Sequence, residues 1–386
     1  MRPPGRRSIF DMFLNHAIPR RPDWLPPYLK ELDGLRGLAV LGVFLFHARV
    51  RLLGSWLYFP ASAGWSGVSL FFVLSGFLIT SILLNAREQS LYHYYRDFYA
   101  RRALRILPVY FLLIAVCFAG PKWLLGLGLV GFPKWKMLVA MLLFSQNLFH
   151  AQLLGGLEPT WSLAIEEQYY FAWAPIVKLV RHISLLIAGL VGVIVLSPIL
   201  RLEWVGYFNS TNTLFHLDCI AYGSLLAVGI MTFGWKRQTW LWTGAAFTVG
   251  GFAALYAAHG AAFQDSALGL GLAGLVLVAI VGSGTHMPLT YFLRHGPLPF
   301  YGRISYGFYL IHIPVIMGLG LFYSFIDRRT GGNVLWANLL VVLVQLTIST
   351  MIALFMWHRL EKPILRLKRY FTNEAKEEKA AVCIAL

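Results

Sequence analysis

The chain is poor in charged residues and in cysteine. Only 13% of its 386 residues are charged, against roughly a quarter in soluble domains, while 58% are hydrophobic. This balance excludes an ordinary soluble enzyme and a disordered chain. Three cysteines are too few for a disulfide framework, and no CxxC pair or Cys/His cluster suggests a metal site. A mean hydropathy of +0.63 indicates one polytopic integral membrane domain.

Long polar stretches that could build a soluble domain are also absent. The net charge is nevertheless +16, from 33 Lys and Arg against 17 Asp and Glu. In a soluble protein this excess would suggest a nucleic-acid partner. Here the cations fall between and beside apolar runs, and Lys and Arg are retained on the cytoplasmic side of membranes. We therefore expect membrane lipids as partners, and no nucleic acid.

Eleven apolar runs follow a basic, proline-bearing N-terminal segment. They occupy residues 35–53, 65–84, 105–120, 137–149, 161–180, 183–200, 213–233, 239–257, 266–282, 304–325 and 334–357. Most can cross a hydrocarbon core of about 30 Å, but the thirteen residues of 137–149 fall below the usual spanning length. If that run does not cross, the other ten place the main basic clusters on one side. The sequence thus predicts an all-α polytopic bundle of about ten transmembrane helices plus a short re-entrant or interfacial segment.

The same reasoning divides the chain into three parts. We expect a basic cytoplasmic N-terminal tail at 1–31, the transmembrane domain at 32–363 and a charged cytoplasmic C-terminal tail at 364–386. No apolar stretch lies close to Met1, which argues against a cleaved signal peptide. Segment 89–104 mixes tyrosines with arginines and predicts an amphipathic interfacial helix that leads into the third span.

Ionisable side chains within apolar runs are costly and mark candidate functional sites. Arg36 and His47 are eleven residues apart in the first run, so in a helix they share a face, separated by about 16 Å of rise. The alternative is an interfacial anchor at Arg36 and a helix-packing donor at His47. Glu166 and Glu167 lie about two turns into a later span, where at least one carboxylate should face the bundle interior.

Arginines gather where the third span begins. Arg102 and Arg105 are three residues apart, on one helical face at the predicted cytoplasmic mouth, where guanidinium groups suit phosphate. The alternative is a positive-inside cluster that binds lipid headgroups. The remaining polar candidates are Ser75, Trp161, His216, Asp218, Tyr309 and His312. Packing is the alternative role for Ser75, and a structural role is favoured for His216.

In their order and spacing these segments resemble the acyltransferase-3 family of integral membrane O-acyltransferases. The resemblance rests on LDGLRGLAVLGVFLFH, GVSLFFVLSGFLIT, RRALRILPVYF, TWSLAIEEQYYF, LDCIAYGSLLA, and ISYGFYLIHIPV followed by LEKP. It runs from about Leu32 to Pro363. His216 stands where an arginine is frequent in the family. Because no SGNH esterase-like domain follows the last helix, the chain resembles a stand-alone member.

The resemblance implies transfer of an acyl group, often acetyl, from cytoplasmic acyl-coenzyme A to a hydroxyl group. The acceptor would be a saccharide or a glycosylated or lipid-linked molecule, and the site would lie in a bacterial inner membrane with both termini cytoplasmic. Acyl-coenzyme A would be a donor substrate, with no permanently bound cofactor. Arg101, Arg102 and Arg105 would hold its phosphates, and Arg36 another phosphate or the pantetheine arm.

A hydroxyl that attacks a thioester must lose its proton as the new bond forms. His47 is the expected general base, with Glu166 orienting it or balancing its charge. A covalent acyl-His47 relay is the competing mechanism. Candidates for oxyanion or acceptor contacts are Ser75, Tyr309, His312, Trp161 and Asp218.

A proton-coupled transporter or a component of an export complex is the alternative function. Buried His, Asp and Glu side chains would suit a carrier, but we find no inverted repeat and no mid-membrane helix break in the sequence. An export scaffold would not need an arginine pair at the mouth aligned with a buried histidine.

Overall fold

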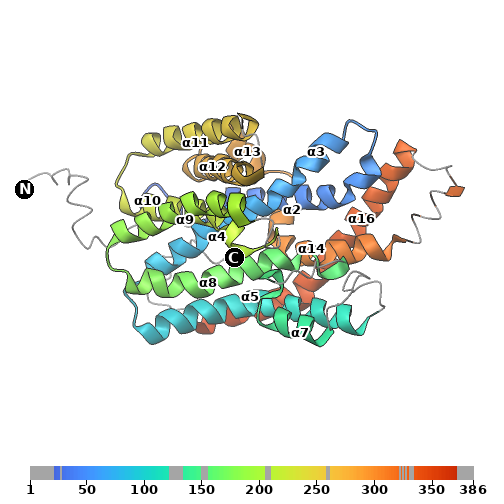
Figure 1. Cartoon of the computed structure of the whole chain (residues 1–386), viewed down its shortest axis with the longest axis horizontal. Coiled ribbons are helices and arrows are strands. Elements are labelled where there is room, and N and C mark those ends of the chain that lie inside the picture. The colour runs from blue at the N-terminus through green and yellow to red at the C-terminus, as the bar shows by residue number, and fades with distance from the viewer. Residues whose placement is uncertain are drawn as a thin grey trace, which may run out of the picture.

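The fold consists of helices joined by short turns (Figure 1). The computed structural model describes residues 21–120 except Pro27, then 134–148, 155–204, 210–257, 261–320 and 334–371, together with Tyr323, Ile326, Arg328 and Arg329. These residues contain helices and no strand. The first twenty residues, the segment 121–133 and the chain from residue 372 onward lie outside the described part, and so does most of each predicted tail.

Within the described residues, ten helices have 16 residues or more. They are α2 (Lys30–Ala48), α4 (Ser66–Asn85), α5 (Leu91–Ala119), α8 (Thr160–Leu179), α9 (Ile183–Trp204), α10 (Leu217–Thr232), α11 (Arg237–Ala257), α12 (Ala261–Val281), α14 (Leu298–Gly318) and α16 (Leu335–Met356). The shorter elements include α3 (Tyr58–Ser62), α7 (Lys134–Leu142), α13 (Pro288–Arg294) and α17 (Lys362–Leu365).

Five segments of the described chain are long and apolar enough to cross a membrane by length and composition. They are Tyr58–Asn85, Leu91–Ala119, Ile183–Trp204, Ala262–Val281 and Leu335–Phe371. These helices indicate an integral membrane protein, whereas the count of ten spans stays a prediction. Helix α7 has nine residues, which span about 14 Å and therefore less than half of a hydrocarbon core.

Helix α5 continues without a break from the predicted interfacial segment into the third predicted span. Ser90 caps its N-terminus by accepting a hydrogen bond from the backbone N–H of His93. A single helix of 29 residues, with Pro108 inside it, holds the arginine-rich first half and the apolar second half. The arginines therefore belong to the same helix as the third predicted span.

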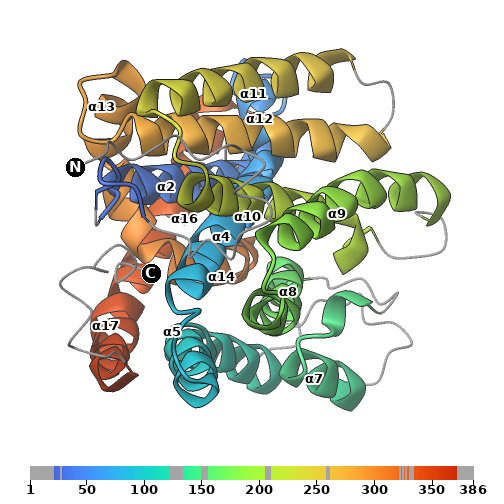
Figure 2. The ribbon, with the colours of Figure 1, turned by 90° about the vertical axis from the view of Figure 1, so that its left-hand side faces the viewer.

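Three close helix pairs organise the bundle: α2 with α14, α4 with α10, and α11 with α12. Figures 1 and 2 place α11 and α12 along one side of the molecule and α5 with α7 along the opposite side, with α2 and α4 between them. The core cluster runs through α2, α4, α8, α10 and α14. Apart from α5, the helices that carry the predicted site residues are thus the ones at the centre.

Glycines permit the closest of these contacts. A Cβ atom on Gly302 of α14 would lie 1.9 Å from the backbone oxygen of Asp33 in α2, and one on Gly37 would lie 2.0 Å from that of Leu298. Only glycine lets two backbones approach this closely, as in other small-residue helix contacts in membranes. The α2–α14 pair, which carries Arg36 and His47 on one helix and His312 on the other, is fixed by this contact.

Candidate active site

A cavity with an empty volume of about 770 Å³ opens between five of the long helices. Its walls come from α2, α4, α5, α8 and α14. The polar lining residues are Arg36, Ser75, Arg102, Arg105, Ser162, Glu166, Tyr170, Ser305, Tyr306 and Tyr309. Six of these, from five separate segments of the sequence, are predicted site residues: Arg36, Ser75, Arg102, Arg105, Glu166 and Tyr309.

Three guanidinium groups gather at one end of the cavity. Arg36 lies close enough to Arg102 to interact electrostatically with it, and Arg105 lies close enough to interact with both. All three groups carry positive charge. Within the described part of the chain, no carboxylate oxygen lies within 4 Å of any of these three groups. Arg102 stacks over the ring of Tyr170 at 4.7 Å. A cluster of like charges without close carboxylates is a candidate anion site.

Arg101, the third predicted arginine of α5, is not among the lining residues. Its Nε donates to the backbone oxygen of Asp97 at 2.9 Å, so the side chain turns back along its own helix. Lys368, in the 3₁₀ segment Arg366–Phe371, is an electrostatic neighbour of Arg101, Arg102 and Arg105. Further basic residues therefore lie around this end of the cavity, in addition to those that line it.

The middle of the cavity carries a carboxylate and two hydroxyl groups. Glu166 has Arg102, Tyr170 and Ser75 as neighbours. Ser75 and Tyr170 are hydrogen-bonded to each other across the α4–α8 contact. Glu166 thus faces the bundle interior and balances part of the arginine charge. The carboxyl oxygen Oε1 of Glu167, in contrast, is buried without a hydrogen-bond partner among the described residues and lies off the cavity.

At the far end, hydroxyl groups and histidines form a connected series. The hydroxyls of Ser162 and Tyr309 are 2.7 Å apart, and both line the cavity. The backbone oxygen of Tyr309 lies 2.6 Å from Nδ1 of His312. Nε2 of His312 lies 3.2 Å from Nδ1 of His47. The two histidines therefore follow directly behind the cavity wall, on α14 and α2.

His47 itself does not line the cavity but lies between that wall and the surface. Its Nε2 is 3.9 Å from Oε1 of Glu158, with 21% of the His47 side chain and 44% of the Glu158 side chain exposed. Glu158 lies just before α8, and burial raises the pKa of its carboxyl, an effect that Arg49 partly offsets. The predicted partner Glu166 and His47 share no hydrogen bond or ion pair; Glu158 is the carboxylate near His47 instead.

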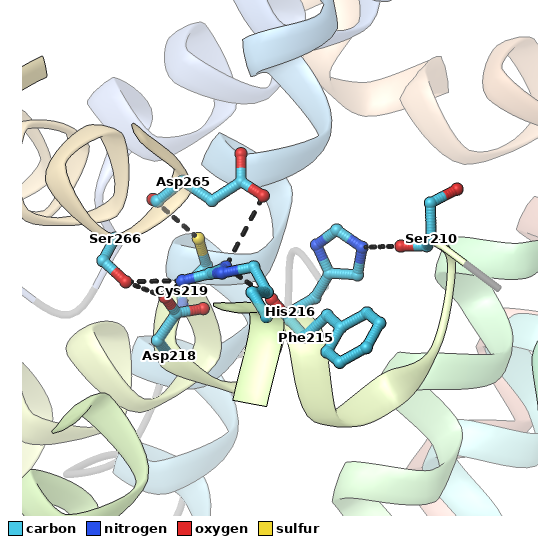
Figure 3. Close-up of polar contacts among 8 residues, drawn as sticks. Ser210, Phe215, His216, Asp218, Cys219, Asp265 and Ser266 are labelled. Carbon is cyan, nitrogen blue, oxygen red and sulfur yellow. Dashed lines mark hydrogen bonds and ion pairs between the residues drawn. The ribbon is translucent and has the colours of Figure 1, made fainter. Parts of the chain in front are cut away.

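Asp218 lies away from the cavity, in a buried polar cluster (Figure 3). Its carboxyl Oδ2 accepts from Nη2 of Arg201 at 2.5 Å, and Nη2 also lies 2.5 Å from the hydroxyl of Ser266. Asp265 completes the cluster with Oδ2 at 3.5 Å from Nη1 of Arg201. These contacts join α9, α10 and α12. Asp218 thus holds helices together and does not line the cavity.

His216 and Trp161 lie together beside the cavity wall. Their ring centroids are 5.2 Å apart, and both rings lie about 6 Å from Phe72, a lining residue. Nε2 of His216 lies 3.0 Å from the backbone oxygen of Ser210 (Figure 3). His216 thus lies in an aromatic environment beside the cavity, and Trp161 forms a second layer behind the cavity wall.

Replacing Arg201 by leucine should destabilise the protein strongly. The substitution leaves the Asp218 carboxylate buried without its guanidinium partner, which typically costs about 3–5 kcal/mol. We expect a clear fall in the apparent melting temperature of the purified protein in detergent, and partial recovery in Arg201→Leu/Asp218→Asn. Lys236→Leu, at an exposed cation, is the matched control. A single Arg201→Leu variant as stable as the wild type would contradict this role.

Several residues of the site were not identified from the sequence. Tyr170, Tyr306, Ser162 and Ser305 line the cavity without having been singled out. Tyr170 lies in the same TWSLAIEEQYYF segment as Glu166, and its spacing of four from Glu166 places it one turn further on the same helical face. This spacing could have identified Tyr170 as a site residue from the sequence. Glu158 precedes the helix and reaches His47 only through the fold.

The chain belongs to the acyltransferase-3 family. The family model, described as an acyltransferase domain, matches residues 29–358. The matched region contains every residue that lines the cavity, as well as His47, Glu158 and His312. Family membership, together with the apolar helices, defines the class of protein to which this cavity belongs.

Curated relatives share this region. The peptidoglycan O-acetyltransferase OatA of Listeria monocytogenes is 29% identical over 320 residues, which cover 75% of this chain and 49% of the relative. The putative peptidoglycan O-acetyltransferase YrhL of Bacillus subtilis is 28% identical, with coverages of 93% and 59%. The O-acetyltransferase OatA of Staphylococcus aureus is 28% identical, with coverages of 77% and 52%. The chain thus spans about half the length of these relatives. No solved structure matches it.

Proposed function

We propose that the protein is a membrane-embedded O-acyltransferase that moves an acyl group, most simply acetyl, from cytoplasmic acyl-coenzyme A to a hydroxyl of a saccharide or a glycosylated or lipid-linked acceptor. Family membership supports the reaction class. The names of the relatives, which specify O-acetyl transfer and in two cases peptidoglycan, support acetyl and a carbohydrate acceptor. Acyl-coenzyme A serves as a substrate and no metal takes part.

One observation carries the donor assignment: the three guanidinium groups without close carboxylates at one end of the cavity. Coenzyme A carries several phosphate oxygens, and arginine binds phosphate through paired charge-assisted hydrogen bonds. In the proposal, Arg102 and Arg105 hold these phosphates with Lys368 and Arg101 nearby. Arg36 contacts another phosphate or the start of the pantetheine arm, which then extends along the cavity.

The thioester at the end of that arm reaches the Ser162–Tyr309 end of the cavity, beside the two histidines. The acceptor approaches from the exposed side of His47 and Glu158. His47 takes the proton of the acceptor hydroxyl as its oxygen attacks the thioester carbonyl carbon. The tetrahedral intermediate then collapses: the C–S bond breaks, the coenzyme A thiolate leaves with the proton from His47, and the new ester remains.

The tetrahedral oxyanion needs a hydrogen-bond donor close to the thioester. The hydroxyls of Tyr309 and Ser75 meet that need from the cavity wall, and Tyr309 is the nearer to the histidines. In this proposal Glu166 balances the arginine charge, and Glu158 faces Nε2 of His47. A covalent acyl-His47 relay is the competing path, and a mass increase of one acetyl group on His47 would favour it.

The proposed arrangement in the membrane is based on the distribution of Lys and Arg along the chain. The arginine end of the cavity faces the cytoplasm of a bacterial cell, ten helices cross the inner membrane, and α7 stays at the interface or re-enters. The transmembrane domain comprises 32–363, with cytoplasmic tails at 1–31 and 364–386.

Purified protein in nanodiscs should turn over acetyl-coenzyme A. Without an acceptor, water replaces the hydroxyl, so we expect slow release of free coenzyme A that rises when a short peptidoglycan fragment is added. The measurement is thiol release by absorbance, with product detection by mass spectrometry and heat-inactivated protein as the control. Absence of both binding and turnover with every short acyl donor would overturn the donor assignment and favour a carrier.

A further inference from the structure

His312 is a buried side chain, and its hydrogen-bonding contacts define which ring nitrogen carries hydrogen. Only 1% of the residue is exposed. Its Nδ1 lies 2.6 Å from the backbone oxygen of Tyr309, and a carbonyl oxygen can only accept. Nδ1 of His312 therefore carries the hydrogen. Because burial disfavours the charged ring, the neutral form is present and Nε2 keeps a free lone pair.

That lone pair and a backbone oxygen together define which nitrogen of His47 carries hydrogen. Nδ1 of His47 lies 3.2 Å from Nε2 of His312 and 2.9 Å from the backbone oxygen of Val43. Both neighbours are acceptors, so Nδ1 of His47 is the donor in each contact. The neutral ring then has its only unprotonated nitrogen at Nε2. This atom faces Glu158, at 3.9 Å, on the exposed side.

We infer that His312 is a positioning residue for the proposed reaction: it accepts a hydrogen bond from Nδ1 of His47 and thereby holds His47 as a base with Nε2 directed toward the acceptor side. This inference rests on the proposed function. His312 does not line the cavity and makes no contact with the reacting atoms in this scheme. It differs from the oxyanion or acceptor contact that the sequence alone suggested for this residue.

The backbone oxygen of Val43 makes the shorter of the two contacts, at 2.9 Å against 3.2 Å, and favours the same hydrogen position on Nδ1 of His47. It lies four residues before His47 on the same helix, so it does not link the His47 ring to α14. His312 belongs to the facing helix. Nε2 of His312 therefore sets the orientation of the His47 ring relative to α14, the helix that contributes Tyr309 to the cavity wall. When His47 takes up a proton, the same contact stabilises the charge on the ring.

Two variants separate this role from simple packing. His312→Gln keeps an amide oxygen to accept from His47 and an amide N–H₂ to donate to Tyr309. His312→Phe keeps a ring that can stack near Phe308, as the imidazole does, but offers no acceptor. We expect His312→Phe to lower kcat for acetyl-coenzyme A hydrolysis about 10- to 100-fold with KM changed less than about twofold, and His312→Gln to recover most of kcat.

The assay uses full-length protein in nanodiscs, with acetyl-coenzyme A as the probe and wild type, His47→Ala and both His312 variants side by side. If His312→Phe does not fold, His312→Met takes its place as the variant without an acceptor nitrogen. Unchanged kcat in the apolar variant, or equal loss in His312→Gln, would overturn the positioning role. Wild-type protein without His47-dependent turnover would instead show that the proposed function has failed.

Discussion

Replacement of His47 by alanine is expected to lower kcat for acetyl-coenzyme A turnover by about 100- to 10,000-fold, the usual contribution of a general base. The KM for the donor should change little, because His47 lies outside the cavity lining and far from the arginine end. The measurement is steady-state release of free coenzyme A by nanodisc-embedded protein, with and without an acceptor fragment. Stability should be nearly unaffected, since the side chain is partly exposed and its partners are another histidine and a backbone oxygen.

His295→Ala is the matched control. His295 is exposed after α13, and its Nδ1 lies 2.8 Å from the backbone oxygen of Tyr291, four residues earlier, much as His47 meets Val43. This control should keep wild-type turnover. If His47→Ala retains turnover at a normal protein level, another group removes the proton and the base assignment is wrong. Turnover lost equally in both variants would indicate a general effect of histidine removal on the fold.

The double variant Arg102→Ala/Arg105→Ala is expected to weaken binding of acyl-coenzyme A by at least about 100-fold. Each charge-assisted hydrogen bond contributes roughly 1.5–3 kcal/mol, and two guanidinium groups are removed together. The loss should appear in KM and in equilibrium binding by calorimetry, while kcat at saturation changes much less.

A donor without phosphates tests the location of this effect. Acetyl-pantetheine carries the same thioester but no nucleotide phosphates, so the wild type and the double-arginine variant should use it with similar kcat/KM. Arg96→Ala is the control on the same helix: its guanidinium pairs with Asp97 and lies off the cavity. Equal loss with acetyl-pantetheine and acetyl-coenzyme A would show that the two arginines act on the thioester or on the fold, and not on phosphate.

Much of the architecture was predictable because a membrane protein must satisfy its backbone within each helix. The apolar runs beginning at 183, 239 and 334 correspond closely to α9, α11 and α16. The boundary between an amphipathic segment and a span was not resolved from the sequence. The aromatic and basic segment before residue 105 was expected as an interfacial helix that leads into the third span, and it forms the first half of the single helix α5. The mean hydropathy changes at this position, but a change in side-chain polarity does not by itself interrupt a helix.

The site was predictable where burial of an ionisable side chain in an apolar segment is energetically unfavourable, because such a side chain is a candidate functional residue. Arg36 and Glu166 were found because an ionisable group inside an apolar run requires a partner. Tyr170 and Tyr306 were missed because tyrosine is common in membrane helices and a hydroxyl carries no such cost. Glu158 was missed for a different reason: it is a loop residue, and nothing in its sequence surroundings indicates which helix it approaches.

The sequence by itself determined the class of protein, the all-helical fold and the identity of the charged groups that the bundle must accommodate. These depend on composition and on local spacing, which hold for each helix separately. Only the tertiary structure decided which groups meet. The glycine contact of α2 with α14 brings His312 to His47, and Asp218 pairs with Arg201 in place of a cavity contact. Partners of this kind depend on the packing of helices distant in sequence, and no local pattern encodes it.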